Sequence, residues 1–306
     1  MTPTAVVVTG GAGFIGRALV LELAMAGQPV FVIDNLSLPG AAKMPRLPRG
    51  AELVEADIRD TDRVRAVFKR ERPATVYHLA AIHFIPACEA DPAECISVNT
   101  AGAAAVLEAC SLVSPQPACV LASTGAVYAP SLLAHDEGDR LAPVDVYGLS
   151  KLWMEQIAAL FAARHGIRVA VARLFNTYGP GETNPHLIPA LIEQVIAGAV
   201  VRAGNIETRR DYVHVHDVAR ALQAMAGRTE TLNVGSGHAR SGHEVITAIG
   251  GVVGRELEVE TDASRLRKVD RPLLLSDPSR AAELLGWRAE ISFEQGIADL
   301  LSGVRA

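Results

Sequence analysis

The feature that most constrains the fold is a β-branched run that ends directly in a glycine-rich turn. Residues A-V-V-V-T (5–9) have the composition of a buried strand, and T-G-G-A-G-F-I-G (9–16) follows without a break. Glycines at this spacing allow a tight turn, close approach of the backbone to a pyrophosphate and close packing of the next helix, whose N-terminus faces the anion. The sequence therefore predicts a dinucleotide site formed by Gly10, Gly13, Phe14, Ile15 and Gly16.

An acidic residue ends the next β-branched run. V-F-V-I-D (30–34) places Asp34 18 residues after Gly16. A carboxylate at this position accepts hydrogen bonds from a ribose 2′-hydroxyl and repels a 2′-phosphate. No arginine directly follows Asp34, which favours NAD over NADP, although Arg46 and Arg49 leave NADP open as an alternative. A turn with only a structural role would need neither the repeated glycines nor the acid.

Short apolar runs alternate with Ala- and Leu-rich segments over the first 175 residues. Runs that are apolar throughout are typical of parallel strands buried on both faces. The alternation predicts an α/β fold, a Rossmann-type doubly wound parallel sheet with right-handed crossovers. The expected strands are 5–9, 30–34, 51–55, 75–79, 118–123 and 169–174, and the expected helices are 14–26, 60–70, 93–111 and 148–165.

The pattern changes after residue 175. The segment N-T-Y-G-P-G-E-T-N-P-H (176–186) is rich in turn formers, and a helix is expected near 187–198, followed by short strands. We therefore expect a smaller C-terminal α/β substrate-binding cap on the first domain. The expected NAD-binding domain is 1–174 plus roughly 211–234, and the expected substrate-binding cap is 175–210 and 235–306.

Composition excludes several classes of partner. The net charge is −5 and no basic run occurs, so no nucleic-acid partner is expected. No apolar run approaches the length of a membrane span, and the N-terminus lacks the pattern of a signal peptide. The cysteines have neither metal-ligand nor redox spacing, so we expect no metal and four reduced, structural thiols at Cys88, Cys95, Cys110 and Cys119. These observations predict a cytoplasmic protein.

Residues Y-G-L-S-K (147–151) place a tyrosine and a lysine four positions apart. On a helix, Tyr147 and Lys151 would share a face. At about 5 Å and an effective dielectric near 20, the ammonium would favour the phenolate by about 3 kcal/mol and lower the tyrosine pKa by about two. Tyr147 would then be a base near neutral pH, whereas the alternative is an ordinary amphipathic helix. Ser123 and Thr124, at the end of an expected strand, would lie at the same ligand-binding edge of the sheet.

Eight motifs, in order along the chain, resemble the extended short-chain dehydrogenase/reductase family, and within it the nucleotide-sugar epimerases and dehydratases. The resemblance covers essentially the whole chain. The motifs are T-G-G-A-G-F-I-G (9–16), H-L-A-A (78–81), V-N (98–99), S-T-G-A-V-Y (123–128), Y-G-L-S-K (147–151), R-L-F-N-T-Y-G-P (173–180), R-D-Y-V-H-V-H-D (210–217) and N-V-G-S-G (233–237).

The resemblance implies a role for each site residue. Tyr147 would be the base that takes a proton from a sugar hydroxyl, and Thr124 would share the hydrogen bond of that sugar hydroxyl with Tyr147. Lys151 would lower the tyrosine pKa and bind the nicotinamide ribose. Asp57 would meet the adenine edge; its alternative role, the N-cap of the helix near 60, suits Asp60 better. The remaining expected cofactor contacts are Asn35, Ile58, Leu79, Ala80, Ala81 and Asn99, the last chiefly through the local backbone.

The resemblance also implies a nucleotide-sugar substrate. Asn176 and Arg210 match contacts to the diphosphate, where an arginine suits phosphate. Arg267 would be a second phosphate ligand, with Arg271 as the rival. His83, His186 and Leu187 are further candidates for substrate contact, whereas His214 lies in an apolar strand pattern and is expected in the core.

Two positions discriminate between the reactions of the family. Dehydratases carry an Asp-Glu pair after the threonine and some decarboxylases carry a glutamate, whereas this chain has Gly125 and Ala126. The expected reaction is therefore 4-epimerisation through a 4-keto sugar, with NAD recycled in each turnover. The alternatives are an NAD(P)-dependent reductase or 3,5-epimerase of a GDP-linked sugar, which V-V-R-A-G-N (200–205) favours, and a non-catalytic dinucleotide sensor. The resemblance implies a homodimer through helices 93–111 and 148–165.

Overall fold

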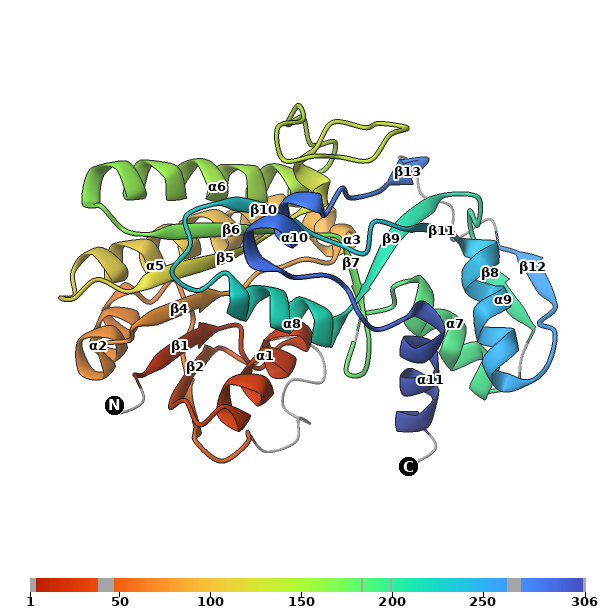
Figure 1. Ribbon diagram of the computed structural model, residues 1–306, viewed down its shortest axis with the longest axis horizontal. Helices are drawn as coiled ribbons and strands as arrows, with labels where there is room; N and C mark the ends of the chain where they lie inside the picture. Colours follow the sequence, from red (N-terminus) through yellow and green to blue (C-terminus); the bar gives the residue numbers. More distant parts are fainter. Residues whose placement is uncertain (1–3, 38–46, 183, 199, 263–270, 305–306) are drawn as a thin grey trace.

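The computed structural model describes residues 4–37, 47–182, 184–198, 200–262 and 271–304. Its centre is a parallel seven-stranded sheet with the strand order β10-β6-β5-β4-β1-β2-β3 (Figure 1). This confirms the expected doubly wound sheet. Its strands are β1 (Val6–Thr9), β2 (Val30–Asp34), β3 (Ala51–Glu55), β4 (Thr75–His78), β5 (Ala118–Thr124), β6 (Val169–Leu174) and β10 (Thr231–Val234).

Helices cover both faces of this sheet (Figure 1). On one face α1 (Phe14–Met25) and α8 (Val215–Ala224) pack on each other and on the strands, and α10 (Ser279–Leu285) joins them. The other face is covered by α2 (Thr61–Glu71), α5 (Gly102–Ser111) and α6 (Val146–His165). Most strands are therefore buried on both sides, which explains why their sequences are apolar throughout rather than alternating. The edge strand β3 is the exception, with a partly exposed sequence that contains Glu52 and Glu55.

Two parts of this domain differ from the sequence prediction. The expected helix 93–111 is divided into α4 (Pro92–Ile96), a π-helical segment (Ser97–Ala101) and α5, and a short helix α3 (Ile85–Ala90) precedes it. Asp91 caps α4 by accepting a hydrogen bond from the Glu94 N–H, and the π segment turns buried Asn99 toward the sheet edge. The seventh strand, β10, was not among the six expected, because it lies beyond the change of pattern at residue 175.

A second, smaller unit contains a four-stranded sheet and three helices. The strands are β7 (Asn176–Tyr178), β9 (Arg209–His214), β11 (Ala239–Ser241) and β13 (Leu273–Leu274), and a separate pair is β8 (Val201–Ala203) with β12 (Val259–Thr261). The helices α7 (Leu187–Ile196), α9 (Gly242–Val253) and α11 (Phe293–Val304) enclose an apolar core with these strands. This unit is the expected α/β cap.

The chain passes between the two units more than once. Strand β9 belongs to the small sheet, but α8, which directly follows it, packs on α1, and β10 pairs with β6. Among the described residues, no helix is long and apolar enough to cross a membrane. All four cysteines are free and buried, as expected.

Candidate active site

The glycine loop after β1 has the close contacts that its sequence predicts. A Cβ on Gly10 would lie 2.5 Å from the Ala80 backbone nitrogen, and one on Gly16 would lie 2.1 Å from the Gly10 carbonyl oxygen. Gly10 has φ of +69°, which L-residues rarely adopt. Gly13 is the N-cap of α1 and provides no side-chain hydrogen bond, so the first-turn N–H groups at Phe14 and Ile15 are directed toward the loop without a capping side chain. A diphosphate fits this cradle.

Asp34 lies at the end of β2 beside the loop. Its two carboxylate oxygens accept hydrogen bonds from the backbone N–H groups of Ala12 at 3.0 Å and Leu36 at 2.9 Å. Burial raises the pKa of this carboxyl and the two backbone hydrogen bonds lower it. Each oxygen keeps a second acceptor site, so Asp34 fits the ribose hydroxyls of NAD.

Asp57 lies after β3 and is engaged by its neighbours. Arg59 forms an ion pair with it at 2.7 Å, and the Asn35 amide donates to it at 3.2 Å. Hydrogen bonds from Arg59 lower the pKa of Asp57 to about 2. Asp60, not Asp57, caps α2, in agreement with the sequence preference. Ile58 is buried against Gly102, so its side chain belongs to the core.

The segment after β4 forms a wall beside the glycine loop. Leu79, Ala80 and Ala81 follow His78, whose imidazole is hydrogen-bonded to the Thr9 hydroxyl at 2.7 Å. Asn99 bonds to the Ile82 backbone, accepting from its N–H at 2.8 Å and donating to its carbonyl at 2.9 Å. The same amide donates to Ser150 Oγ at 2.9 Å. Asn99 therefore connects this wall to the helix that carries the tyrosine and lysine.

Tyr147 and Thr124 meet at the carboxyl end of β5. Thr124 Oγ1 accepts a hydrogen bond from the Ala126 N–H at 3.1 Å, and the Tyr147 hydroxyl lies near enough to Thr124 for the two side chains to interact. Part of Tyr147 is accessible to solvent, yet burial is the largest influence on its hydroxyl and raises its pKa well above the ordinary value. The Thr124 hydrogen bond is the main influence that lowers it.

Lys151 corrects part of the sequence argument. Its side chain is buried, and Nζ donates to the Ala122 carbonyl oxygen at 2.8 Å. Burial lowers the Lys151 pKa to about 8. The prediction that the ammonium holds the Tyr147 pKa near neutrality is therefore wrong for this structure, because helical spacing takes no account of desolvation, which disfavours both charged forms.

Several family motifs supply a buried polar network beneath the site. Arg173 forms an ion pair with Glu155 at 2.7 Å, and both side chains are less than 10% exposed. Arg173 also donates to the Tyr128 hydroxyl at 3.0 Å, which donates to Asn233 at 2.7 Å. The network joins α6, β6 and β10 and fixes the segment that follows Thr124.

The expected substrate contacts come from the small unit. Asn176 begins β7 and pairs with Tyr212 of β9. Arg210 lies two residues before Tyr212 on β9, and its guanidinium donates to the Arg271 carbonyl at 2.8 Å. Buried Arg271 donates to the carbonyls of Ala126 and Tyr128, both at 2.9 Å, and therefore holds the loop after β5. Sequence reasoning considered Arg271 only as a phosphate ligand. Arg267 lies outside the described residues.

His83 and His186 lie close together at the start of α7, whereas Leu187 packs against the core of the small unit. The Asn184 amide contacts His83 Nε2 at 3.0 Å, and the ring centroids of His83 and His186 are 6.1 Å apart. Glu182 joins this group, although the sequence gave no reason to select it. His214 is buried in the core as expected, but its Nε2 has no hydrogen-bond partner.

Gly125 is packed against the Phe175 ring. A Cβ at this position would meet the ring at 3.0 Å, so a larger residue here would require the ring to shift by a few tenths of an ångström. Ala126 is buried, and its carbonyl accepts from Arg271. The positions that carry an acid–base pair in the dehydratases are therefore part of the packing here.

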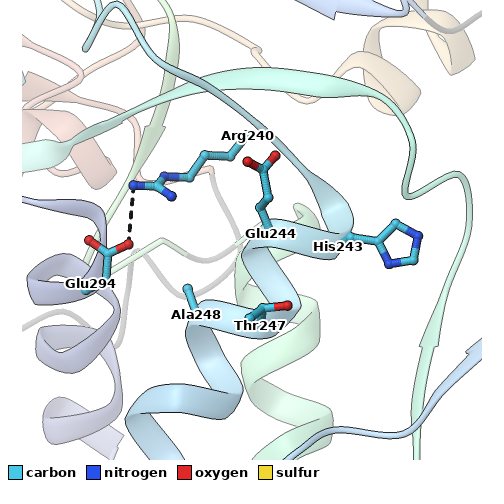
Figure 2. A pocket seen from close by; sticks show the side chains of 6 residues that line it. All are labelled: Arg240, His243, Glu244, Thr247, Ala248 and Glu294. Atoms are coloured by element: carbon cyan, nitrogen blue, oxygen red, sulfur yellow. Dashed lines mark ion pairs between the residues drawn. The ribbon is translucent and has the colours of Figure 1, made fainter.

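A separate cavity of about 290 Å³ lies in the small unit, between α9 and α11 (Figure 2). It is lined by Arg240, His243, Glu244, Thr247, Ala248 and Glu294, and Arg240 forms an ion pair with Glu294 at 3.3 Å. None of the expected site residues that the structure describes lines this cavity.

Comparisons with known proteins agree with this geometry. The chain is 32% identical to a UDP-glucose 4-epimerase of Lacticaseibacillus casei, over 92% of this chain and 91% of the relative. It is 28% identical to a GDP-6-deoxy-D-mannose reductase of Pseudomonas aeruginosa, over 96% of this chain and 95% of the relative. Among solved structures, the UDP-glucose 4-epimerase of Thermotoga maritima with UDP-glucose superposes with a TM-score of 0.92 at 29% identity, covering 99% of both chains. The UDP-glucose 4-epimerase of Thermus thermophilus in complex with NAD superposes with a TM-score of 0.89 at 30% identity, and the match covers 99% of each chain.

The family model for the NAD dependent epimerase/dehydratase family matches residues 6–235. This match spans the large sheet, the glycine loop, the Thr124–Tyr147 pair and Lys151, and it continues through Arg210. The predicted family, class of enzyme and cofactor are thereby confirmed. With the fold, the site and the relatives in agreement, the chain belongs to the NAD dependent epimerase/dehydratase family.

Proposed function

We propose that the chain is an NAD-dependent nucleotide-sugar 4-epimerase that works through a transient 4-keto sugar. The observation that carries this proposal is that Tyr147 and Thr124 meet at the cofactor edge, where Gly125 and Ala126 follow the threonine in place of an acid–base pair. Gly125 and Ala126 fill the positions where elimination chemistry would need acids. The UDP-glucose 4-epimerases among the relatives favour a UDP-linked sugar.

In the proposed mechanism, Tyr147 accepts the proton of the sugar 4-hydroxyl while hydride leaves C4. NAD, when bound, supplies the hydride acceptor and a positive ring charge that favours the phenolate. Thr124 holds the hydroxyl through its bond to Tyr147, and Lys151 binds the nicotinamide ribose. Turning of the keto sugar exposes its other face to the returning hydride, and Tyr147 gives the proton back.

The nucleotide part of the substrate would lie on the small unit. Arg210 offers a guanidinium to the diphosphate, and Asn176 offers its amide on the neighbouring strand. Arg271 would act indirectly, because its two bonds to the loop after β5 position Thr124. Tight binding through the nucleotide would leave the sugar free to turn.

A substrate panel tests the proposal. UDP-, GDP-, CDP- and dTDP-linked hexoses are incubated with the purified protein without added cofactor, and epimers are separated by chromatography. We expect release of the 4-epimer of a UDP-sugar, with NAD copurifying, because a cofactor recycled in each turnover has no need to leave. Stoichiometric consumption of NADPH with a reduced GDP-sugar would overturn the proposal and support the reductase alternative, which the Pseudomonas relative favours.

We also propose a homodimer formed through α5 and α6. Trp153 and Leu160, seven residues apart on one face of α6, are 37% and 55% exposed. A second copy packing on this face would cover them. Sedimentation should give twice the chain mass, and Leu160→Glu should shift the equilibrium toward the monomer; a wild-type monomer at all concentrations would contradict the dimer. The buried free thiols support a reducing, cytoplasmic location.

A further inference from the structure

Three side chains of metal-binding type meet at the boundary between the two units. His83 follows β4 in the large domain, whereas Glu182 and His186 belong to the segment between β7 and α7. Each offers one ligand atom, and these atoms lie within 4.8 Å of one another. Spacing in the sequence gave no metal site, because 99 residues separate the first ligand from the second.

The acceptor atoms of this cluster already converge on one donor. The Asn184 Nδ2 group contacts His83 Nε2 at 3.0 Å and Glu182 Oε1 at 3.3 Å. With the amide in this orientation, the imidazole nitrogen presents its lone pair to the same point as the carboxylate oxygen.

The supports on either side hold the ligands in place. Both polar groups of the Ile82 backbone, next to His83, are bonded to Asn99 at 2.8 and 2.9 Å. On the other side, Arg17 of α1 donates to the Gly181 carbonyl at 2.9 Å, next to Glu182. His186 is the N-cap residue of α7, yet its side chain makes no capping hydrogen bond.

We propose that His83, Glu182 and His186 bind one divalent transition-metal ion, with Zn²⁺ as the preferred ion. Two imidazole nitrogens and one carboxylate oxygen suit zinc, whereas Mg²⁺ and Ca²⁺ favour sites formed by oxygen alone. In a tetrahedral site, bonds of about 2.0–2.2 Å place the ligand atoms about 3.3–3.6 Å apart. The ligand atoms, which now lie within 4.8 Å of one another, would therefore move together by up to about 1.4 Å on binding the ion.

Three protein ligands leave a fourth position for water or another oxygen ligand, as in zinc sites that bind substrate. The ion would also join the two units, since its ligands come from both. The site uses neither Tyr147 nor Thr124, so its existence is independent of the proposed 4-epimerase chemistry.

Metal titration tests the site in the full-length protein. The protein is treated with EDTA, desalted and titrated with ZnCl₂ by isothermal calorimetry, with MgCl₂ in parallel. We expect one Zn²⁺ per chain with a Kd below about 1 µM, no comparable binding of Mg²⁺, and a weakening of about 100-fold in Glu182→Gln. His243→Asn removes an exposed imidazole that pairs with Glu207 at 3.1 Å outside the cluster, and should leave the affinity unchanged.

A second variant guards against indirect effects of Glu182→Gln on folding. Co²⁺ replaces Zn²⁺, and its visible absorption reports nitrogen ligation at the ion. The spectrum of wild type should be altered in His186→Gln and retained in His243→Asn. Absence of saturable 1:1 zinc binding in wild type, or equal zinc affinity in wild type and both cluster variants, would overturn the proposal.

Discussion

The large domain presents its site residues from the ends of parallel strands, whereas the small unit presents them from separate turns and a strand. The glycine loop, Asp34 and Thr124 each follow a strand of the same sheet, so a single edge gathers them. Asn176, Arg210 and the Glu182–His186 turn lie in different elements of the small unit. The proposed cofactor site therefore depends on the order of strands in the sheet, and the proposed substrate site depends on how turns and a strand of the small unit pack beside it.

The two regions also hold their buried charges differently. In the large domain, Glu155 is paired with Arg173. In the small unit, Asp211 is fully buried without an arginine or lysine partner among its described contacts, and it accepts hydrogen bonds from the backbone and hydroxyls of Ser236 and Ser276 and from the Gly237 N–H. The first arrangement fixes one helix on the sheet, and the second fixes two loops around the substrate edge.

Tyr147→Phe tests the large domain with the largest expected effect. The ring keeps its packing and only the hydroxyl is lost, so NAD binding and the melting temperature should change little. The loss of the general base should lower kcat by about 10²–10⁴. Turnover is measured with the substrate found in the panel, and bound NAD by absorbance after denaturation.

The double variant sharpens this result. If Tyr147 and Lys151 act together, Tyr147→Phe with Lys151→Ala should cost far less in log rate than the sum of the single changes. Full additivity, or normal turnover of Tyr147→Phe, would show that the large domain does not hold the base.

Lys151→Met tests whether burial governs this part of the site. The Lys151 pKa is lowered to about 8 in the folded chain from 10.5. Between these values the unfolded chain binds the additional proton, so the free energy of unfolding should rise with pH across this window. Relative to that of Lys151→Met, the free energy of unfolding of the wild type should increase by about 3 kcal/mol between the folded and unfolded pKa values of Lys151. Urea unfolding at each pH measures this free energy, and Lys69→Met, at an exposed lysine, is the control. If the free energy of unfolding depends on pH in the same way in the wild type and in Lys151→Met, Lys151 does not have the pKa that burial gives it.

Arg210→Met tests the small unit. Loss of a charged hydrogen-bond donor to the diphosphate should raise KM for the nucleotide sugar by about 10- to 100-fold, with kcat changed much less. The matched control is Arg209→Met, because the Arg209 side chain pairs with Glu244 at 3.0 Å on the surface. Equal effects of the two changes would mean that Arg210 does not contact the substrate.

Asp34→Ala should have the smallest of these effects. Removing the carboxylate should weaken the binding of NAD by about 10-fold. It should also reduce the preference of the protein for NAD over NADP, because repulsion of the 2′-phosphate is lost. Dissociation constants for both cofactors give the ratio. Asp57→Ala is the comparison, because an adenine contact is common to both cofactors and leaves the ratio unchanged. If the ratio of the NAD and NADP dissociation constants is the same in Asp34→Ala as in the wild type, the Asp34 carboxylate does not contact the ribose.

Local sequence was sufficient for most of the large domain. Six of its strands and the start of α1 could be read from apolar runs and glycine spacing, because both depend on neighbouring residues. The division of 93–111 into three segments could not, since the π segment depends on Asn99 meeting Ile82 and Ser150, which are distant in sequence. Strand β10 was missed because its pairing partner, β6, lies some 60 residues earlier.

What the sequence determined by itself was the order of chemical groups along the strand ends: the phosphate turn, the ribose acid, and the threonine, tyrosine and lysine beside them. Only the tertiary structure determined the electrostatic environment of these groups and the residues that pack around them. Burial reversed the expected Tyr147 pKa shift, Phe175 closed the space beside Gly125, and two distant segments brought His83 against Glu182. Desolvation and close contact depend on what packs around a residue, and that packing involves the whole chain rather than its local order.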